Sequence, residues 1–461
     1  VRSPQQREMW ETILPRDILA LNEELEQIDR FLDDERFLLP YFKKHQTFKK
    51  LNTGRNSTPI ESYLRLMYLK HRYQLGYDTL VKEVSDSFKW RRFCRLSLSS
   101  KVPDDTTLVK LTNLYGPELA SEINQELVKK LTEKKIIRGK KLRADCKAVE
   151  ANIHFPTDSS LLGDGVKVIN RLVKRLKESG VGVKIKFIEH TRIIKKSLRR
   201  LTKFKKLGED KTKELCRIII RHTRRTVKRA KAMSKAASRA LRNGRVKKAM
   251  KAAVGRTNQR LKNFIKVTEK LLGQSQEVLK GNHHLPNRRI SVFNSKAKPI
   301  VTGKQSKKTT FGNKVLVAEV EQGIVSQCQV LSGNPSETSL PKGLLKSHQE
   351  TFGHVPKELA TDRGLSSAKN ERLAIKMGVK RVSMPVRGKP SKERKKYERQ
   401  YWFKRLQKFR AGSEGRLSYL ARCYGFDRCD LTGENGMENW TGWGVVAHNL
   451  KKTSTLMGAM G

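Results

Sequence analysis

The sequence predicts a mixed α/β fold, in which a sheet-containing core follows a helical region and is interrupted by a second helical block. Apolar residues recur at helical spacing up to about residue 135 and again from about 159 to 279. A period-two pattern runs from Lys141 to Val149, and strand and helix signals alternate after Ile290. We therefore expect four segments: a helical region at 1–135, the first part of the core at 136–158, a helical insertion at 159–285, and the rest of the core with C-terminal helices at 286–461.

The charge of the chain predicts its class of partner. The 461 residues include 99 Lys and Arg against 45 Asp and Glu, a net charge of +54. An excess of this size binds a polyanion through counterion release, so nucleic acid is the expected partner and a generic metabolic enzyme is disfavoured. No apolar run approaches the roughly 20 residues that a membrane helix needs, and no secretory signal opens the chain. We expect a cytoplasmic protein without membrane contact.

The helical region 1–135 contains a candidate DNA-binding segment. Residues 60–73 carry apolar side chains near helical spacing, which predicts an amphipathic helix. Aromatic and basic residues interleave from Phe88 to Phe93, with Arg91 and Arg92 at the centre. Such a segment suits a helical DNA-binding module, with both arginines on phosphate. A core of aromatics with a solvated basic rim explains the same pattern equally well.

The insertion at 159–285 has the most one-sided charge in the chain. From Arg221 to Arg260 it holds fifteen Lys and Arg and no Asp or Glu. A charge run is ordinarily a solvated or disordered face, but here apolar residues at helical spacing accompany it, which favours helices that contact phosphate on one side. The candidate DNA-binding residues are Arg224, Arg225, Lys247 and Lys248.

The segment 286–461 predicts strands and helices in alternation. Residues 314–320 and 324–331 read as a hairpin around Gln322-Gly323. The further elements, in chain order, are a helix near 336–352, a strand at 358–362, a helix at about 366–377, a strand near 380–385, and helices over 392–422 and 442–452.

Three acids lie where packing alone does not call for them. Asp145 is inside a strand of small and apolar residues, Asp362 ends a second strand, and Glu414 lies on a helix between two glycines. Phosphodiester chemistry commonly uses two divalent cations, and hard cations such as Mg²⁺ take carboxylate oxygens. Each acid alone also reads as structural: an ion-paired strand residue, a cap before a helix, or a surface pair with Arg410. Together they favour a metal site.

These residues carry a resemblance that covers most of the chain. The matching segments are Ser57–Glu61, Leu64–Lys70, Arg91–Cys94, Asp145–Leu162, Ala360–Gly364 and Gly412–Arg416, of which Asp145–Leu162 is the most specific. The chain resembles the DDE transposases of bacterial insertion sequences. That resemblance implies an α/β ribonuclease H-like catalytic core, a five-stranded mixed sheet with flanking helices, with an N-terminal helical domain and here a large basic helical insertion.

The resemblance also implies a function and a site. Asp145, Asp362 and Glu414 would form the catalytic triad and hold two Mg²⁺ or Mn²⁺ ions, while water nicks double-stranded DNA at the transposon ends and the freed 3′ hydroxyl attacks target DNA. Arg410 matches an arginine that such enzymes often place before the glutamate, and Arg416 is a further candidate for phosphate. A homodimer at synapsis and nucleoid association in a bacterial cytoplasm are expected.

Two alternatives accompany this reading. Glu434 and Glu438 are rivals of Glu414 as the third ligand, because they lie in the same part of the sequence. A non-enzymatic or degenerate DNA-binding protein is the alternative function, because intact acids do not guarantee intact geometry.

Overall fold

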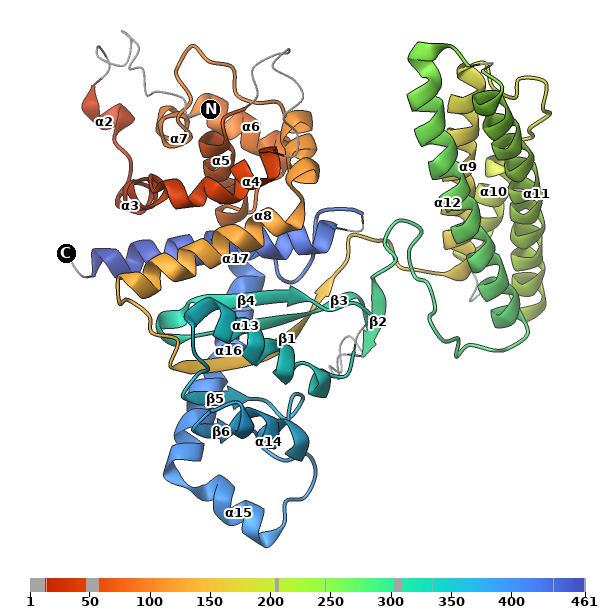
Figure 1. Cartoon of the computed structure of the whole chain (residues 1–461). Helices are drawn as coiled ribbons and strands as arrows, with labels where there is room; N and C mark the ends of the chain where they lie inside the picture. The colour runs from red at the N-terminus through yellow and green to blue at the C-terminus, as the bar shows by residue number, and fades with distance from the viewer. Residues whose placement is uncertain are drawn as a thin grey trace. The chain divides into compact units, whose positions relative to one another are not determined.

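The computed structural model describes residues 13, 15–46, 58–203, 207–244, 246–301, 309–333, 335–433 and 435–459 (Figure 1). They form two compact units: residues 1–152 together with 300–461, and residues 153–299. Ser57 of the resembling segments and the rival ligand Glu434 lie outside the described residues.

The first unit begins with short helices. Their bounds are α2 Arg16–Leu19, α3 Glu23–Leu32, α4 Leu39–Gln46, α5 Ile60–Arg72, α6 Tyr77–Asp86, α7 Phe88–Phe93 and α8 Asp105–Glu133, with a 3-10 turn η1 at Glu35–Phe37. The predicted amphipathic helix is α5, but it is buried on nearly all sides because α6, α16 and α17 pack around it. The polar side chains of α5 therefore need partners, and Arg65, for example, forms a salt bridge with Asp29. Helix α8 is kinked at Gly116, where Pro117 follows.

The core of this unit is a mixed sheet. Its strands are β1 Lys141–Glu150, β2 Lys298–Val301, β3 Thr309–Glu319, β4 Val325–Val330, β5 Glu358–Thr361 and β6 Arg381–Ser383, in the order β2-β3-β1-β5-β6 with β4 also on β3. Strands β1, β5 and β6 run parallel, whereas β3 is antiparallel to both β1 and β4. The period-two strand and the hairpin predicted from the sequence are confirmed as β1 and as β3 with β4.

The sheet has six strands, so the expectation of five was wrong. Strand β3 is eleven residues long, and β4 pairs only with Val315–Glu319 on its far edge. The first residues of β3 would otherwise present unpaired backbone groups. The short strand β2, which directly precedes β3 in the described chain, lies beside it and fills this place.

The remaining helices of this unit pack on the sheet or on one another. They are α13 Pro341–Phe352, α14 Ala368–Lys376, α15 Lys392–Arg399, α16 Tyr401–Tyr424 and α17 Gly436–Gly458, with 3-10 turns η3 Glu321–Gly323 and η4 Glu337–Ser339. Helix α16 packs along β1, β5 and β6, and α17 joins β4 to α8 and α5 (Figure 1). Asn449 of α17 accepts from Val325 N and donates to Val325 O, which fixes this helix to the sheet.

The second unit is a four-helix bundle. Its helices are α9 Asp158–Glu178, α10 Thr191–Leu201, α11 Glu209–Arg242 and α12 Lys248–Leu279. Aliphatic side chains from all four make one buried core, including Ile169, Ile194, Ile219 and Leu261. Asp158 accepts from both Gln274 and Arg288, so the start of α9 and the end of the bundle are tied together. The charged insertion therefore folds around a core of its own.

Candidate active site

Asp145 and Asp362 meet on two neighbouring strands, β1 and β5, in the interior of the sheet. Ala144 of β1 pairs with Thr361 of β5, and each aspartate is the next residue along its strand. Asp362 directly follows the carboxyl end of β5, where open α/β sheets place ligands. Asp145 lies in the middle of the longer strand β1, and the parallel register brings it beside Asp362. Leu365 N donates to Asp362 Oδ1, so the turn after β5 holds that side chain in place.

The electrostatics of Asp145 show how close the acids are. Burial raises the pKa of Asp145 to about 6, and repulsion from the Asp362 and Glu414 carboxylates adds to this, while Arg410 acts against it. The side chain is 14 % exposed. The pKa of the Cys146 thiol is likewise raised by burial, with the carboxylates of Glu337, Asp145 and Asp362 adding. The site is thus a concentration of negative charge in a basic protein.

Glu414 reaches the aspartates from α16, with Arg410 between. Arg410 Nη1 lies 3.1 Å from Glu414 Oε1 and 3.9 Å from Asp145 Oδ2. Glu414 itself is 69 % exposed. The third predicted acid therefore lies near enough to Asp145 to add to the rise in its pKa, but Glu414 is paired with the guanidinium of Arg410, which also contacts Asp145. The rival Glu438 is on α17 and lines a different pocket, described below.

A buried ion network fixes α16 to the sheet next to these acids. Glu319, at the end of β3, is 2 % exposed and accepts from Arg143 Nη2 at 2.6 Å and from Arg416 Nε at 3.3 Å. Arg416 also contacts His448 Nε2 through Nη1, at 2.8 Å. The predicted phosphate ligand Arg416 is thus held inside the protein by Glu319 and His448, and its DNA contact stays a prediction.

The glycines beside Glu414 have different surroundings. The group that approaches Gly412 is the guanidinium of Arg143, which a Cβ there would overlap. A Cβ at Gly415 would meet open space. Arg143 needs this gap because it also donates to the carbonyl of Phe409, which places its guanidinium against the helix backbone.

Two supporting residues were not singled out from the sequence. Arg143 shares a strand face with Asp145, and two charges at period two on a buried strand are a signal that could have found it. Gln407 of α16 donates to Ser383 O and Ser383 Oγ, at 3.0 and 2.9 Å, and so ties the helix to β6. An exposed-looking glutamine on a helix gives no such signal in the sequence.

The donor set of the site suits a hard divalent cation. Asp145 supplies carboxylate oxygens from within β1 and Asp362 from the residue after β5, and their mutual repulsion is what a cation would relieve. Within the described ranges, no three His, Cys, Asp or Glu side chains already stand in an ion-holding arrangement. Mg²⁺ is usually held by one or two carboxylates, with waters and substrate phosphates completing the octahedron, so the aspartate pair fits.

The two arginines predicted to bind DNA in the N-terminal helices differ in exposure. Arg91 is buried and donates to three carbonyls of the loop 97–100, so it holds that loop. Arg92 is exposed, and its Nη1 donates to Leu19 O at 2.7 Å. Of the two, Arg92 has the side chain that a phosphate could reach.

In the bundle, all four predicted basic residues are exposed. Arg224 and Arg225 lie on α11, Lys247 precedes α12 and Lys248 begins it. The apolar residues between them, such as Val227 and Met233, are buried in the bundle core. The charges are therefore confined to the outer face of a folded unit.

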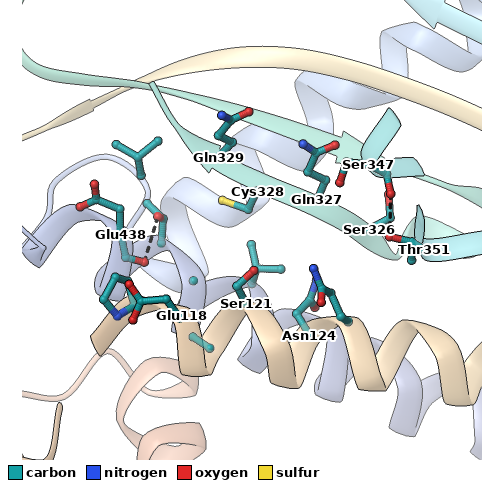
Figure 2. A pocket seen from close by; sticks show the side chains of 17 residues that line it. Glu118, Ser121, Asn124, Ser326, Gln327, Cys328, Gln329, Ser347, Thr351 and Glu438 are labelled. Carbon is teal, nitrogen blue, oxygen red and sulfur yellow. Dashed lines mark hydrogen bonds between the residues drawn. The ribbon is translucent and has the colours of Figure 1, made fainter. Parts of the chain in front are cut away.

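A pocket of about 360 Å³ lies elsewhere in the first unit, between α8, β4 and α17. Figure 2 shows its polar lining, with Cys328 of β4 pointing between Ser121 of α8 and Glu438 of α17. Neither Asp145 nor Asp362 lines this pocket. It is separate from the candidate active site.

Comparison with known proteins identifies the N-terminal helices. The family described as "Transposase domain (DUF772)" matches residues 15–114. This match supports a transposase family. The matched residues run from α2 into α8 and include Arg91 and Arg92, whereas Asp145, Asp362 and Glu414 follow them in the chain. No solved structure matches the chain.

The match supports a function related to transposition, for which the expected substrate is DNA. Such a function gives a reason for the basic charge of the chain, since DNA phosphates must be neutralised wherever a protein binds them. None of the helices in the described part of the chain has the length and apolar character needed to cross a membrane.

Proposed function

We propose that this protein is a DDE-type DNA transposase, which cleaves DNA at the ends of its element and joins the freed ends to target DNA. The observation that carries the proposal is the meeting of Asp145, inside β1, with Asp362, directly after the neighbouring parallel strand β5, while Glu414 of α16 lies near Asp145. The transposase domain matched at residues 15–114 supports it independently. The core is then of the ribonuclease H-like kind, and the enzyme acts as a dimer because two ends must be joined.

The acids would hold two Mg²⁺ or Mn²⁺ ions. When bound, these ions stabilise the attacking and leaving oxygens of an in-line displacement at phosphorus. Asp145 is held within β1 and Asp362 directly after β5, and the hydrogen bond from Leu365 N fixes the Asp362 carboxylate in the turn that follows β5. Arg410 lies 3.9 Å from Asp145 Oδ2 and, once DNA is bound, its guanidinium would contact a phosphate in place of Glu414.

The DNA contacts that take no part in bond cleavage would be made by exposed basic residues. Arg92 in the matched domain and the four basic residues of the bundle have their charges in solvent. Contacts of this kind position DNA without reading its sequence, because they address phosphates. They would hold the element end while the acids act on one phosphodiester.

A second function is favoured by one observation. The contact between Arg410 and Glu414 leaves the third acid paired with a cationic side chain, as a DNA-binding protein without cleavage activity would tolerate. In that case the chain binds the element ends and does not cut them.

A nicking assay tests both functions. The substrate is duplex DNA that carries the inverted repeats flanking the gene, with Mg²⁺ or Mn²⁺ added. Wild type should nick at the repeat ends, whereas Asp145→Asn, Asp362→Asn and Glu414→Gln should lose cleavage and keep DNA affinity. Asp78→Asn, at an exposed aspartate of α6, is the matched control and should cut normally. Binding of the repeats without nicking by wild type would favour the second function, and no preference for the repeats would reject both.

A further inference from the structure

Glu337 brings another carboxylate close to Asp362, at the carboxyl end of β5. It begins the short 3-10 turn η4, ahead of α13. Its Oε1 accepts from Lys314 Nζ of β3 at 2.7 Å, and the glutamate side chain is largely shielded from solvent. The hydrogen bond from Lys314 therefore fixes Oε1 of Glu337. Because the carboxylate is rigid and planar, this also fixes the position of Oε2.

The face of the sheet from which Glu337 comes is opposite to that of Glu414. Lys314 pairs with Ala148 in the antiparallel β1–β3 ladder, and residues directly opposite share a face. By the period of two, Ala148 lies on the face opposite to Asp145. The Asp145 face is covered by α16, through Arg410 and Glu414. The two glutamates thus flank the aspartates, one from each side of the sheet.

The second carboxylate oxygen of Glu337, Oε2, faces Asp362 across a small space. This space stays open because residue 364 is a glycine, which has no side chain. A Cβ at Gly364 would overlap Glu337 Oε2 and would stand 2.8 Å from Asp362 Oδ2. Both carboxylates therefore border the same small space beside the backbone of residue 364. Two carboxylates that face each other in a partly buried space repel, and a hard cation is the group that would join them.

We propose that Glu337 and Asp362 together hold one of the two divalent cations, so that the site uses four carboxylates. This inference rests on the proposed function, and it adds to Asp145, Asp362 and Glu414 a ligand from the opposite face of the sheet. Lys314 is a positioning residue in this arrangement, because it holds one oxygen of Glu337 and leaves the other directed at Gly364. Gly364 is required because any side chain would fill the space.

Binding of Mn²⁺ to the full-length protein tests the proposal without a cleavage assay. Electron paramagnetic resonance measures free Mn²⁺ as the ion is titrated into wild type, Glu337→Gln, Asp362→Asn and Glu350→Gln. Glu350 is an exposed carboxylate on α13 and gives the matched control. We expect the dissociation constant of the affected ion to rise about tenfold or more in Glu337→Gln, as for other changes around metal ligands, and to be unchanged in Glu350→Gln.

The outcomes separate this inference from the proposed function. If Asp362→Asn weakens Mn²⁺ binding and Glu337→Gln does not, Glu337 is only the ion-pair partner of Lys314 and the inference fails while the proposed function stands. If Asp362→Asn leaves Mn²⁺ binding unchanged as well, the proposed metal site itself fails.

Gly364→Ala is an independent test that keeps every carboxylate. Its methyl group should weaken Mn²⁺ binding as Glu337→Gln does, with the melting temperature of the metal-free protein as a check on folding. A folded Gly364→Ala protein with the Mn²⁺ affinity of wild type would overturn the inference.

Discussion

Arg410 and Glu414, one turn apart on α16, are joined by a contact of 3.1 Å between Nη1 and Oε1. The same nitrogen lies 3.9 Å from Asp145 Oδ2, so a single guanidinium bridges two of the three acids. Pairs at this spacing on an exposed helix are ordinarily worth little. Here Arg410 also lies against the partly buried Asp145, so its positive charge repels a cation that binds to this carboxylate.

Replacing Arg410 by Gln should tighten binding of Mn²⁺ to the DNA-free protein. Removal of the guanidinium relieves its repulsion with the ion and releases Glu414. We expect the Mn²⁺ dissociation constant to fall on the order of tenfold, the factor that about 1.4 kcal/mol gives, as measured by electron paramagnetic resonance titration. Lys408→Gln, an exposed charge on the same helix, is the control and should leave it unchanged. Equal or weaker binding in Arg410→Gln would mean that Arg410 does not compete with the ion.

The fold was largely predictable from local patterns. Strand β1 follows from the alternation of Leu142 and Ala144 with charged residues, and the β3–β4 hairpin follows from two apolar runs around Gln322-Gly323. Strand β2 was missed because four residues of mixed polarity carry no periodic signal. Its pairing depends on the free edge of β3, which is a property of the tertiary structure.

The site residues were predictable where an acidic residue stood at a position that packing alone does not explain. Asp145 inside a strand and Asp362 directly after one were such cases, and the structure brings them together. Glu337 was not, because an acid before a helix reads as an ordinary cap. Its closeness to Asp362 depends on Gly364 and Lys314, which are remote from it in sequence.

Neutralising the four basic residues of the bundle should weaken DNA binding and flatten its salt dependence. Arg224, Arg225, Lys247 and Lys248 are exposed, and no acid lies between Arg221 and Arg260 in the sequence. Replacing all four by Gln should lower the slope of log affinity against log salt by up to about 0.9 for each lost phosphate contact. Fluorescence anisotropy with a labelled duplex measures this slope between low and moderate salt.

The control for the bundle has the same charge change on its other helices. The control replaces four other exposed basic residues by Gln. These are Arg171 and Lys174 of α9 and Lys195 and Arg199 of α10. These helices have acids near them in the sequence, such as Asp164 and Glu189, so the effect on the slope should be smaller. Equal slopes for both variants and wild type would make the α11–α12 face a solvated surface.

Arg143→Met should destabilise the protein strongly, because it leaves Glu319 buried with less compensation. Both nitrogens that Arg143 gives to Glu319 would be lost, and Arg416 would remain. Breaking a buried pair from one side costs about 3 to 5 kcal/mol, and urea unfolding measures it. Adding Glu319→Gln should recover part of the loss. Arg381→Met, which removes a half-exposed partner of Glu358, should cost less than about 1 kcal/mol. Similar losses for Arg143→Met and Arg381→Met would show that burial of Glu319 has no such cost.

Glu24 joins the N-terminal helices to α17 through its charge. The carboxylate accepts from Arg72 Nε at 2.8 Å and from Tyr68 Oη at 2.7 Å, and it pairs with Lys451. Burial alone would raise the pKa of Glu24, but the hydrogen bonds from Arg72, Lys451 and Tyr68 outweigh burial and lower the pKa from 4.5 to about 2. The ionised form is therefore the one that stabilises the fold.

The stability that Glu24 contributes should depend on pH in one direction. Because the pKa is lower in the folded protein, the contribution is complete above about pH 4.5 and is lost as the pH falls through about 2. Glu24→Gln should cost about 3 kcal/mol at pH 7 and less than roughly half of that at pH 3, as urea midpoints at the two pH values would show. Glu26→Gln, which removes an exposed pair with Arg30 on the same helix, should cost under about 0.5 kcal/mol at either pH. A loss in Glu24→Gln that is the same at pH 7 and pH 3 would assign the effect to packing of the side chain rather than to its charge.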